Sequence, residues 1–381
     1  MWKKSIVGFD VGIVLPHLLH MPTGGDREVS LLCKRFIRDG YRIAVFYLRN
    51  PEKELLKMLD DEDLKEYMFK RPKIYNLYYS VVTSRAGFYI ILPIIRRIMG
   101  IDFRERYEGA SVFFEKSVGD NIRIENLIAQ SWEASYFVDK HRNSIHKYYR
   151  VHHNLDDPTF SGGLSRLALK SFALPLKKIV QNDHVERRFI QENPIRIHVG
   201  IETSDFVCSV PPNSRENSIL FPIRTNDSKG AKYAIEAIKI LHREMPETKI
   251  YGFGNYSKNK VPDYVEFLGI VSYKNLIALY NKNAVTVIPS VVEGTSSPAL
   301  EAMSCGSALV SSDNEGVSSF ATHDLDAIIV PVRDSIALAN GAMELLNNNE
   351  KRISIALNGI KTAQKHSYER TYLELKKVIF G

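Results

Sequence analysis

Two glutamates and two cations in the second half of the chain have side chains and spacings that could act together on one ligand. Glu293 and Glu301 lie eight residues apart in PSVVEGTSSPALEAMSCG, and Arg224 and Lys229 lie five apart in RTNDSKG. Carboxylates accept hydrogen bonds from hydroxyl groups. Arginine and lysine bind phosphates, the first through a planar fork and the second as a point charge. A ligand with both hydroxyls and a diphosphate, such as a nucleotide sugar, would use all four side chains.

The elements expected around these residues bring them to one edge of a sheet. The apolar run at 284–290 predicts a buried strand, and a helix follows with Ser297 as N-cap and Pro298 at its first position. A helix N-terminus presents free N–H groups and the positive end of the helix dipole, which suits an anion. The run at 218–223 predicts a second strand, which ends just before the two cations.

Each of these features has a simpler explanation when taken alone. A pair of glutamates is commonly a solvated surface, and a basic loop after a strand is commonly surface as well. Here, however, both loops follow strands of one alternating pattern, and the carboxyl ends of parallel strands meet at the same edge of a sheet. The combination therefore favours a binding site.

Strand and helix patterns alternate along the whole chain of 381 residues. This alternation predicts an α/β fold with two Rossmann-like, doubly wound domains facing a cleft. The Pro- and Asn-rich stretch PPNSREN indicates a linker. We therefore expect one domain over 1–205 and a second over 206–367.

The first half offers weaker candidates. Gly24 and Gly25 predict a flexible turn before a helix at about 26–39, and a plain tight turn explains them equally well. His152 and His153 follow a predicted strand, where either could face a ligand or simply bond within the loop. The pattern GxGxxG is absent, so a dinucleotide redox cofactor is not indicated.

The basic charge belongs to the first half. Residues 1–200 carry 32 Lys and Arg against 24 Asp and Glu, a net charge of +8, whereas residues 201–381 carry 19 against 20, a net charge of −1. An anionic partner is therefore expected there: a membrane surface, a charged acceptor or nucleic acid. The segment 85–106 has an apolar centre bracketed by arginines, which suits either a peripheral contact with anionic membrane or a core helix.

The three cysteines exclude two further classes of protein. They are far apart, odd in number and without CxxC spacing, which argues for a reducing compartment and against a disulfide framework or structural zinc. No DxD pair lies in a suitable loop, so no metal site is predicted. No run of 18 apolar residues predicts a membrane span.

The second half resembles the retaining glycosyltransferases of the GT-B class called family 4. The resemblance rests on Arg224 with Lys229 and its following glycine, on the segments GFG and VEFLG, and on the spacing of Glu293 and Glu301, which matches the E-x7-E pattern of that family. HVGIETSDF resembles the family's segment just before the second domain. The first half matches only in outline, through Gly24-Gly25 and a histidine after a central strand.

The resemblance implies a role for each candidate residue. Arg224 and Lys229 would bind the donor diphosphate, Glu301 the ribose hydroxyls, and the loop from Ile270 to Tyr273 the base. Glu293 would bind the donor sugar together with the N–H groups of the loop after it. That loop comprises Gly294, Thr295, Ser296 and Ser297.

The remaining implied roles concern the first domain. Gly24 and Gly25 would let its backbone approach the donor, and His152 or His153 would face the donor, with His152 the catalytic candidate. The first domain would bind the acceptor, and residues 368–381 would form a helix that returns to it.

The resemblance implies a retaining hexosyltransferase, with rhamnosyl transfer as one option, acting on a glycan or lipid-linked acceptor in cell-surface polysaccharide synthesis. The nucleotide sugar is then a substrate, and neither a cofactor nor a metal is expected. A cytoplasmic location at the inner face of the plasma membrane would fit the basic first half. Two alternatives stay open: a non-catalytic membrane- or nucleic-acid-binding protein on the same scaffold, and a sugar-nucleotide epimerase or hydrolase.

Overall fold

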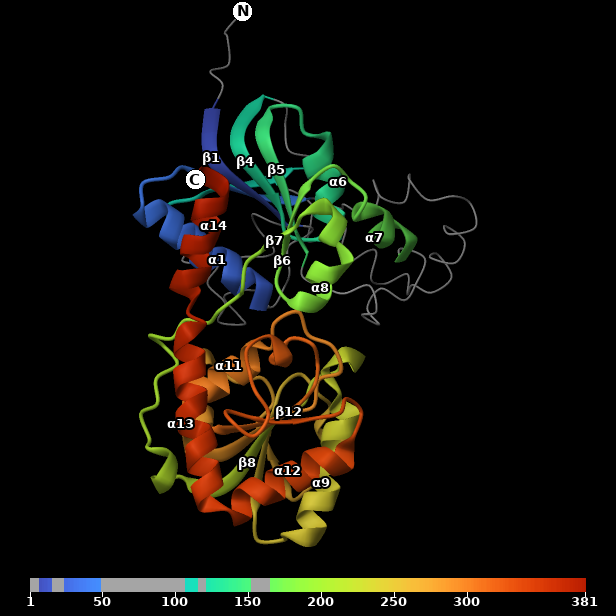
Figure 1. The fold of residues 1–381 in the computed structure, drawn as a ribbon, viewed down its shortest axis with the longest axis vertical. Helices are drawn as coiled ribbons and strands as arrows, with labels where there is room; N and C mark the ends of the chain where they lie inside the picture. Colours follow the sequence, from blue (N-terminus) through green and yellow to red (C-terminus); the bar gives the residue numbers. More distant parts are fainter. Residues whose placement is uncertain (1–6, 16–23, 49–106, 116–120, 152–164) are drawn as a thin grey trace, which may run out of the picture.

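The computed structural model describes residues 7–15, 24–48, 107–115, 121–151 and 165–381. The predictions for His152, His153 and the segment 85–106 fall outside the described residues. The described chain forms two sheets of parallel strands with helices on both faces of each sheet, one above the other in Figure 1. The predicted α/β fold of two doubly wound domains is confirmed.

The first sheet is built from the N-terminal part of the chain. Its strands run in the order β3-β2-β1-β4-β5-β6-β7. The elements are β1 (Val7–Leu15), α1 (Gly24–Arg38), β2 (Ile43–Leu48), β3 (Ser111–Glu115), β4 (Ile122–Ala129), α6 (Trp132–Lys140), β5 (Ser144–Val151), α7 (Ser165–Ser171), β6 (Lys177–Val180), α8 (Asp183–Arg188) and β7 (Ile195–Arg196).

The second sheet has the same winding, in the order β10-β9-β8-β11-β12-β13. Its elements are β8 (Glu216–Pro222), α9 (Ala231–Glu244), β9 (Lys249–Phe253), β10 (Val265–Phe267), α10 (Tyr273–Lys282), β11 (Asn283–Ile288), α11 (Ser297–Ser304), β12 (Ala308–Ser312), β13 (Ile328–Val330), α12 (Ser335–Asn347) and α13 (Asn349–Lys365). The last helix, α14 (Tyr368–Phe380), packs on the first domain. Short 3-10 turns lie at Ile190–Glu192, Pro212–Ser214, Asp227–Lys229, Lys258–Lys260 and Val317–Ser319.

Strands are buried along their whole length where both faces are covered, as in β2 and β11. In β1, Val11 and Ile13 pack on the side of α1 and α14, whereas Val14 packs with α6 on the other side. In β8, Ile219 faces α9 and α12, and Leu220 faces α10 and α11. In both sheets the strand order reverses between the first strand and the fourth, β1/β4 and β8/β11, and ligands of doubly wound sheets bind outside the carboxyl ends of strands at such a point.

Several predicted boundaries are wrong in the first domain. Helix α1 begins at Gly24, so the two glycines form its first turn and not a turn ahead of it. The sequence of residues 122–132 predicts a strand over its whole length, but the strand ends at Ala129, and Trp132 begins α6. The strand before His152 is predicted to begin at Lys147, but it begins earlier, at Ser144. The edge strand β3 was not predicted at all.

The chain passes between the two domains at two places that lie side by side. The N–H of Ile201 donates to the carbonyl of His366 (3.0 Å), and the N–H of Tyr368 donates back to the carbonyl of Ile201 (2.7 Å). Gly200 makes this approach possible, because a Cβ there would lie 2.3 Å from the carbonyl oxygen of His366. After this crossing α14 runs along α1 in the first domain (Figure 1).

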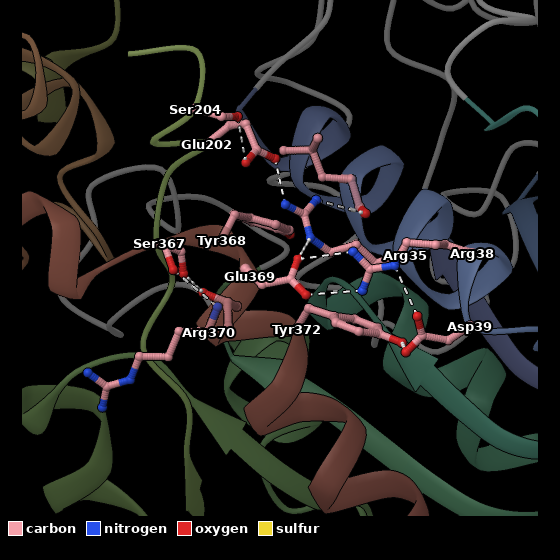
Figure 2. Close-up of polar contacts among 12 residues, drawn as sticks. Arg35, Arg38, Asp39, Glu202, Ser204, Ser367, Tyr368, Glu369, Arg370 and Tyr372 are labelled. Atoms are coloured by element: carbon pink, nitrogen blue, oxygen red, sulfur yellow. Dashed lines mark hydrogen bonds and ion pairs between the residues drawn. The ribbon is translucent and has the colours of Figure 1, made fainter. Parts of the chain in front are cut away.

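A polar cluster joins α14 to α1 and to the segment that leaves the first domain (Figure 2). Arg35 donates to Glu369 (2.8 Å) and to Glu202 (2.7 Å). Asp39 accepts hydrogen bonds from the hydroxyl of Tyr372 (2.7 Å) and from Lys376 (2.6 Å), and these bonds hold the pKa of its carboxyl well below the usual range. The last helix is therefore fastened to the first domain by charged as well as apolar contacts.

Candidate functional site

Lys229 and Glu293 form an ion pair where the chain leaves β8 and β11. Lys229 ends a 3-10 turn, and its Nζ lies 2.6 Å from Oε2 of Glu293. The hydroxyl of Ser290 donates to Oε1 of the same carboxylate (2.8 Å). The Glu293 side chain is only 8% exposed, whereas Lys229 is 26% exposed. Both carboxylate oxygens are thus fixed by neighbours, and the lysine can still reach a ligand.

Gly230 allows the loop after β8 and the loop after β11 to pack against each other. Its φ of 67° is left-handed, and it joins the 3-10 turn to α9. A Cβ at this position would lie 1.9 Å from the carbonyl oxygen of Pro289, at the end of β11. The N–H of Val291 also donates to the carbonyl of Ser228 (2.7 Å). Only glycine allows the lysine loop to pack this closely on the glutamate loop.

We expect Gly230→Ala to lower the free energy of unfolding by at least about 2 kcal/mol, because an alanine there combines left-handed strain with a backbone overlap. Gly269→Ala is the matched control, since Gly269 has nearly the same φ (64°) and a Cβ added there would meet no atom within 4 Å. Denaturant unfolding of both variants measures the difference. Equal losses in the two would contradict the role given to the Pro289 contact.

Glu301 is the second carboxylate of the site. It lies in α11 with its side chain 12% exposed, and Oε2 accepts a hydrogen bond from the hydroxyl of Tyr280 (3.2 Å). Burial raises the pKa of Glu301 to about 7, against the opposing charges of Arg27 and Arg224. Nη1 of Arg27 lies 3.8 Å from Oε1. Glu301 therefore titrates near neutral pH, and Arg224 is close enough to influence it.

The loop between the two glutamates differs in detail from the expectation. The N-cap of α11 is Ser296 and not Ser297, and its side chain makes no capping bond. The N–H of Ser297 donates to the carbonyl of Thr295 (2.9 Å), and that of Glu293 donates to the carbonyl of Asn314 (3.0 Å). These two N–H groups are already used inside the protein, so a ligand would have to use the others in the loop.

The loop assigned to the base lies beside the first domain. Ile270 is 64% exposed and Tyr273 is 37% exposed. The hydroxyl of Tyr273 donates to Asp205 (3.0 Å), and its ring lies under the guanidinium of Arg27, 3.9 Å from the ring centroid. Arg27 comes from α1, so a cation of the first domain touches both Tyr273 and Glu301, the two positions assigned to a nucleoside.

The structure brings the predicted residues of the second domain together, whereas Gly24 and Gly25 lie in the first domain. Arg224, Lys229, Glu293, Glu301 and their loops lie beyond β8 and β11 at the second domain's reversal point. Gly24 and Gly25 open α1, three and two residues before Arg27. Sequence reasoning missed Arg27, Tyr280 and Asn314, and no local spacing connects any of these to the glutamates.

Neither a candidate metal cluster nor a candidate membrane span occurs among the described residues. No group of three or more His, Cys, Asp and Glu side chains in that part of the chain could hold a metal ion. None of the helices in the described ranges is both long enough and apolar enough to cross a bilayer.

Comparison with known proteins shows which family the second domain is similar to. A family model described as Glycosyl transferases group 1 matches residues 207–362. An uncharacterized glycosyltransferase of Methanocaldococcus jannaschii is 31% identical over 204 residues, which cover 49% of this chain and 51% of that relative. The chain thus spans about half the length of the curated relatives it matches. The match to the glycosyl transferases group 1 family therefore lies within the second domain.

Solved structures extend the likeness to the whole fold. Sucrose-phosphate synthase from Thermosynechococcus elongatus superposes with a TM-score of 0.67 at 15% identity, covering 97% of this chain and 98% of that one. HepE of Anabaena, solved with UDP and glucose, gives a TM-score of 0.65 at 14% identity, covering 97% and 99%. The chain therefore has the GT-B fold, with two Rossmann-like domains.

Proposed function

We propose that this protein is a glycosyltransferase that moves a hexosyl group from a nucleotide sugar to a glycan or lipid-linked acceptor, with retention of configuration. The observation that supports it most is the Lys229–Glu293 pair at the reversal point of the second sheet, 2.6 Å apart. A partly exposed cation and a hydroxyl-binding carboxylate stand there beside the N-terminus of α11. A nucleic-acid-binding role would not use the carboxylate, and a sugar-nucleotide epimerase or hydrolase, which would bind the same ligand, is distinguished by needing no sugar acceptor.

Arg224 and Lys229 would act on the bond that breaks. Cleavage between the anomeric carbon and the phosphate oxygen leaves positive charge on the sugar ring and an additional negative charge on the diphosphate. Cations already fixed where that charge develops lower the barrier most, because they need no reorganisation. Lys229 has three N–H donors and can share them between Glu293 and a phosphate. In a retaining reaction, the departing phosphate oxygen would take the proton of the acceptor hydroxyl on the same face of the sugar.

The finer assignments are proposals of the same kind. The +8 charge of residues 1–200 favours an anionic acceptor or the inner face of a membrane carrying a lipid-linked glycan, as in the synthesis of cell-surface polysaccharide. Arg224 and Lys229, the two cationic residues assigned to the diphosphate, would neutralise the leaving group in place of a metal ion. Rhamnose is one hexosyl group that fits this scheme.

The first experiment is a thermal-shift series with UDP, GDP, dTDP and CMP on wild type and on Glu301→Ala. UDP is tested first because HepE was solved with it. A nucleotide at 100 times its dissociation constant should stabilise the wild type by about 2.7 kcal/mol. Removal of Glu301 should reduce this shift, because the ribose hydroxyls lose their acceptor. A wild type that responds to none of the four nucleotides would refute the proposed donor site.

Nucleotide binding should also tighten as pH rises from 6 to 8. The pKa of Glu301 is raised to about 7, so the carboxylate that accepts the ribose hydroxyls is mostly protonated at pH 6 and mostly ionised at pH 8. If only the ionised form binds ribose well, affinity should rise about 10-fold across this range. Calorimetric titration with UDP at several pH values measures it.

Glu301→Gln is the control for this pH dependence, because the β-phosphate of UDP titrates in the same range. In the variant, the pH dependence of UDP affinity that comes from the phosphate should remain, and the part that comes from Glu301 should disappear. Identical pH profiles in wild type and Glu301→Gln would show that Glu301 does not titrate on binding.

A further inference from the structure

The first domain reaches across to the loop that follows Glu293. Gln181 and Asn182 lie just past the end of β6, with 6% and 1% of their surfaces exposed. Nδ2 of Asn182 donates to the carbonyl of Gly294 (2.8 Å). The hydroxyl of Thr295 donates to Oε1 of Gln181 (3.0 Å). Two consecutive residues of one domain thus hold two consecutive residues of the other.

Asn182 has a second task that fixes its orientation. Its Oδ1 accepts a hydrogen bond from the N–H of Val185 (2.9 Å) and caps α8. Because Oδ1 is used by the helix, the amide group can present only Nδ2 to Gly294. The planar side chain therefore sets the distance between the start of α8 and the Gly294 carbonyl. A bond of this kind between two backbone segments restrains both.

We propose that Asn182, assisted by Gln181, is a positioning residue that fixes the Gly294–Thr295 loop from the first domain. The inference rests on the proposed function, in which that loop receives the donor sugar. The groups assigned to the nucleoside diphosphate, Arg224, Lys229 and Glu301, all belong to the second domain. The nucleotide can therefore bind without the contact, whereas the sugar is aligned for transfer only when the two domains meet through Asn182.

This arrangement has a chemical purpose in a transferase. A donor sugar aligned before the domains meet would be exposed to water, which can replace the acceptor and hydrolyse the donor. Because the first domain holds the Gly294–Thr295 loop, the donor sugar is aligned only when the first domain is in contact with that loop. Misplacement of a reacting group by about 1 Å can cost 100-fold in rate, so one hydrogen bond at this place is enough to matter.

Asn182→Asp separates the two tasks of the side chain. Aspartate caps helices as well as asparagine does, so α8 should keep its cap. The variant has no Nδ2 donor and turns a carboxylate oxygen toward the carbonyl of Gly294. We expect kcat for release of UDP from UDP-glucose, with water as the acceptor, to fall about 10- to 100-fold, the size expected when a buried carbonyl is left without its donor. The dissociation constant of UDP should stay within about twofold, and the variant should still unfold cooperatively because α8 keeps its cap.

Asn348→Asp is the matched control. Asn348 also caps a helix through its side chain, accepting from the N–H of Lys351 (3.0 Å), and it lies at the start of α13 within the second domain. This variant should keep wild-type kcat. Asn182→Ala, which loses the cap as well as the donor, should lower both kcat and Tm.

Hydrogen–deuterium exchange on the free, full-length protein tests the contact without any donor. Amides of the peptide covering 290–300 should exchange faster in Asn182→Asp than in wild type or Asn348→Asp. Unchanged exchange, unchanged kcat, or a parallel loss of UDP affinity and kcat would each overturn the inference. Failure of the proposed function would look different, because wild type itself would then bind none of the nucleotides while the exchange difference persisted.

Discussion

Lys229→Met should reduce turnover about 10²- to 10³-fold, the cost of removing one fixed donor from a developing charge. The lysine is the exposed partner of a pair whose other member is buried, so its ammonium is the part that a diphosphate can reach. Methionine keeps the length of the side chain and removes the charge. Steady-state kinetics on the nucleotide sugar selected by the thermal-shift series measures the loss.

Lys232→Met is the control for this prediction. Lys232 lies one turn along, on the exposed side of α9, and its substitution should leave both turnover and nucleotide binding unchanged. The Lys229→Met protein should still unfold cooperatively, because Ser290 continues to hold Glu293. Near-normal turnover in a folded Lys229→Met protein would remove Lys229 from the mechanism and move attention to Arg224.

Arg150→Met should lower the free energy of unfolding by about 3–5 kcal/mol, the usual cost of leaving a buried charge without its partner. Arg150 in β5 is 2% exposed and pairs with Glu28 of α1, whose side chain is 9% exposed. The carbonyl of Glu28 also accepts the hydroxyl of Tyr368 (2.7 Å), so the pair lies where β5, α1 and α14 meet. Chemical denaturation of the full chain measures the loss.

A double variant distinguishes the charge from the packing. Nε and Nη1 of Arg150 are buried and have no hydrogen-bond partner among the described residues. Replacing Glu28 by Leu together with Arg150 by Met removes both charges and keeps the volume, and it should recover most of the stability. A double variant as unstable as Arg150→Met alone would show that packing, and not the unpaired carboxylate, causes the loss.

Local signals were enough to predict the second domain. The strand–helix alternation and the glycine before α9 each act within a few residues. The family resemblance, and not a local signal, implied a helix over 368–381; α14 lies at Tyr368–Phe380, and Ser367 caps it by accepting from the N–H of Arg370 (3.3 Å). The one-residue error at α11 has a local cause too, because Thr295, Ser296 and Ser297 are three consecutive residues that can all cap a helix.

Contacts between distant residues account for what the sequence did not reveal. Glycine is a poor helix former, yet Gly24 and Gly25 are helical because α1 is fixed by its contacts with β5 and α14. The short strand β3 is defined by its pairing with β2 at the sheet edge. Arg27 reaches Glu301, and Asn182 reaches Gly294, only after both domains have folded and met. No spacing in one domain can encode a partner in the other.

The paired crossing at Ile201 and Ser367 decides how chimaeras of this protein must be made. The second domain is topologically an insertion, whose two ends leave the first domain at one point. A transplant of everything after residue 201 would bring in a foreign α14 and break the Arg35–Glu369 and Asp39–Tyr372 bonds. A cassette limited to residues 202–366 would leave α14 with its own domain. Donor preference should therefore be exchangeable between relatives through two junctions, and not through one.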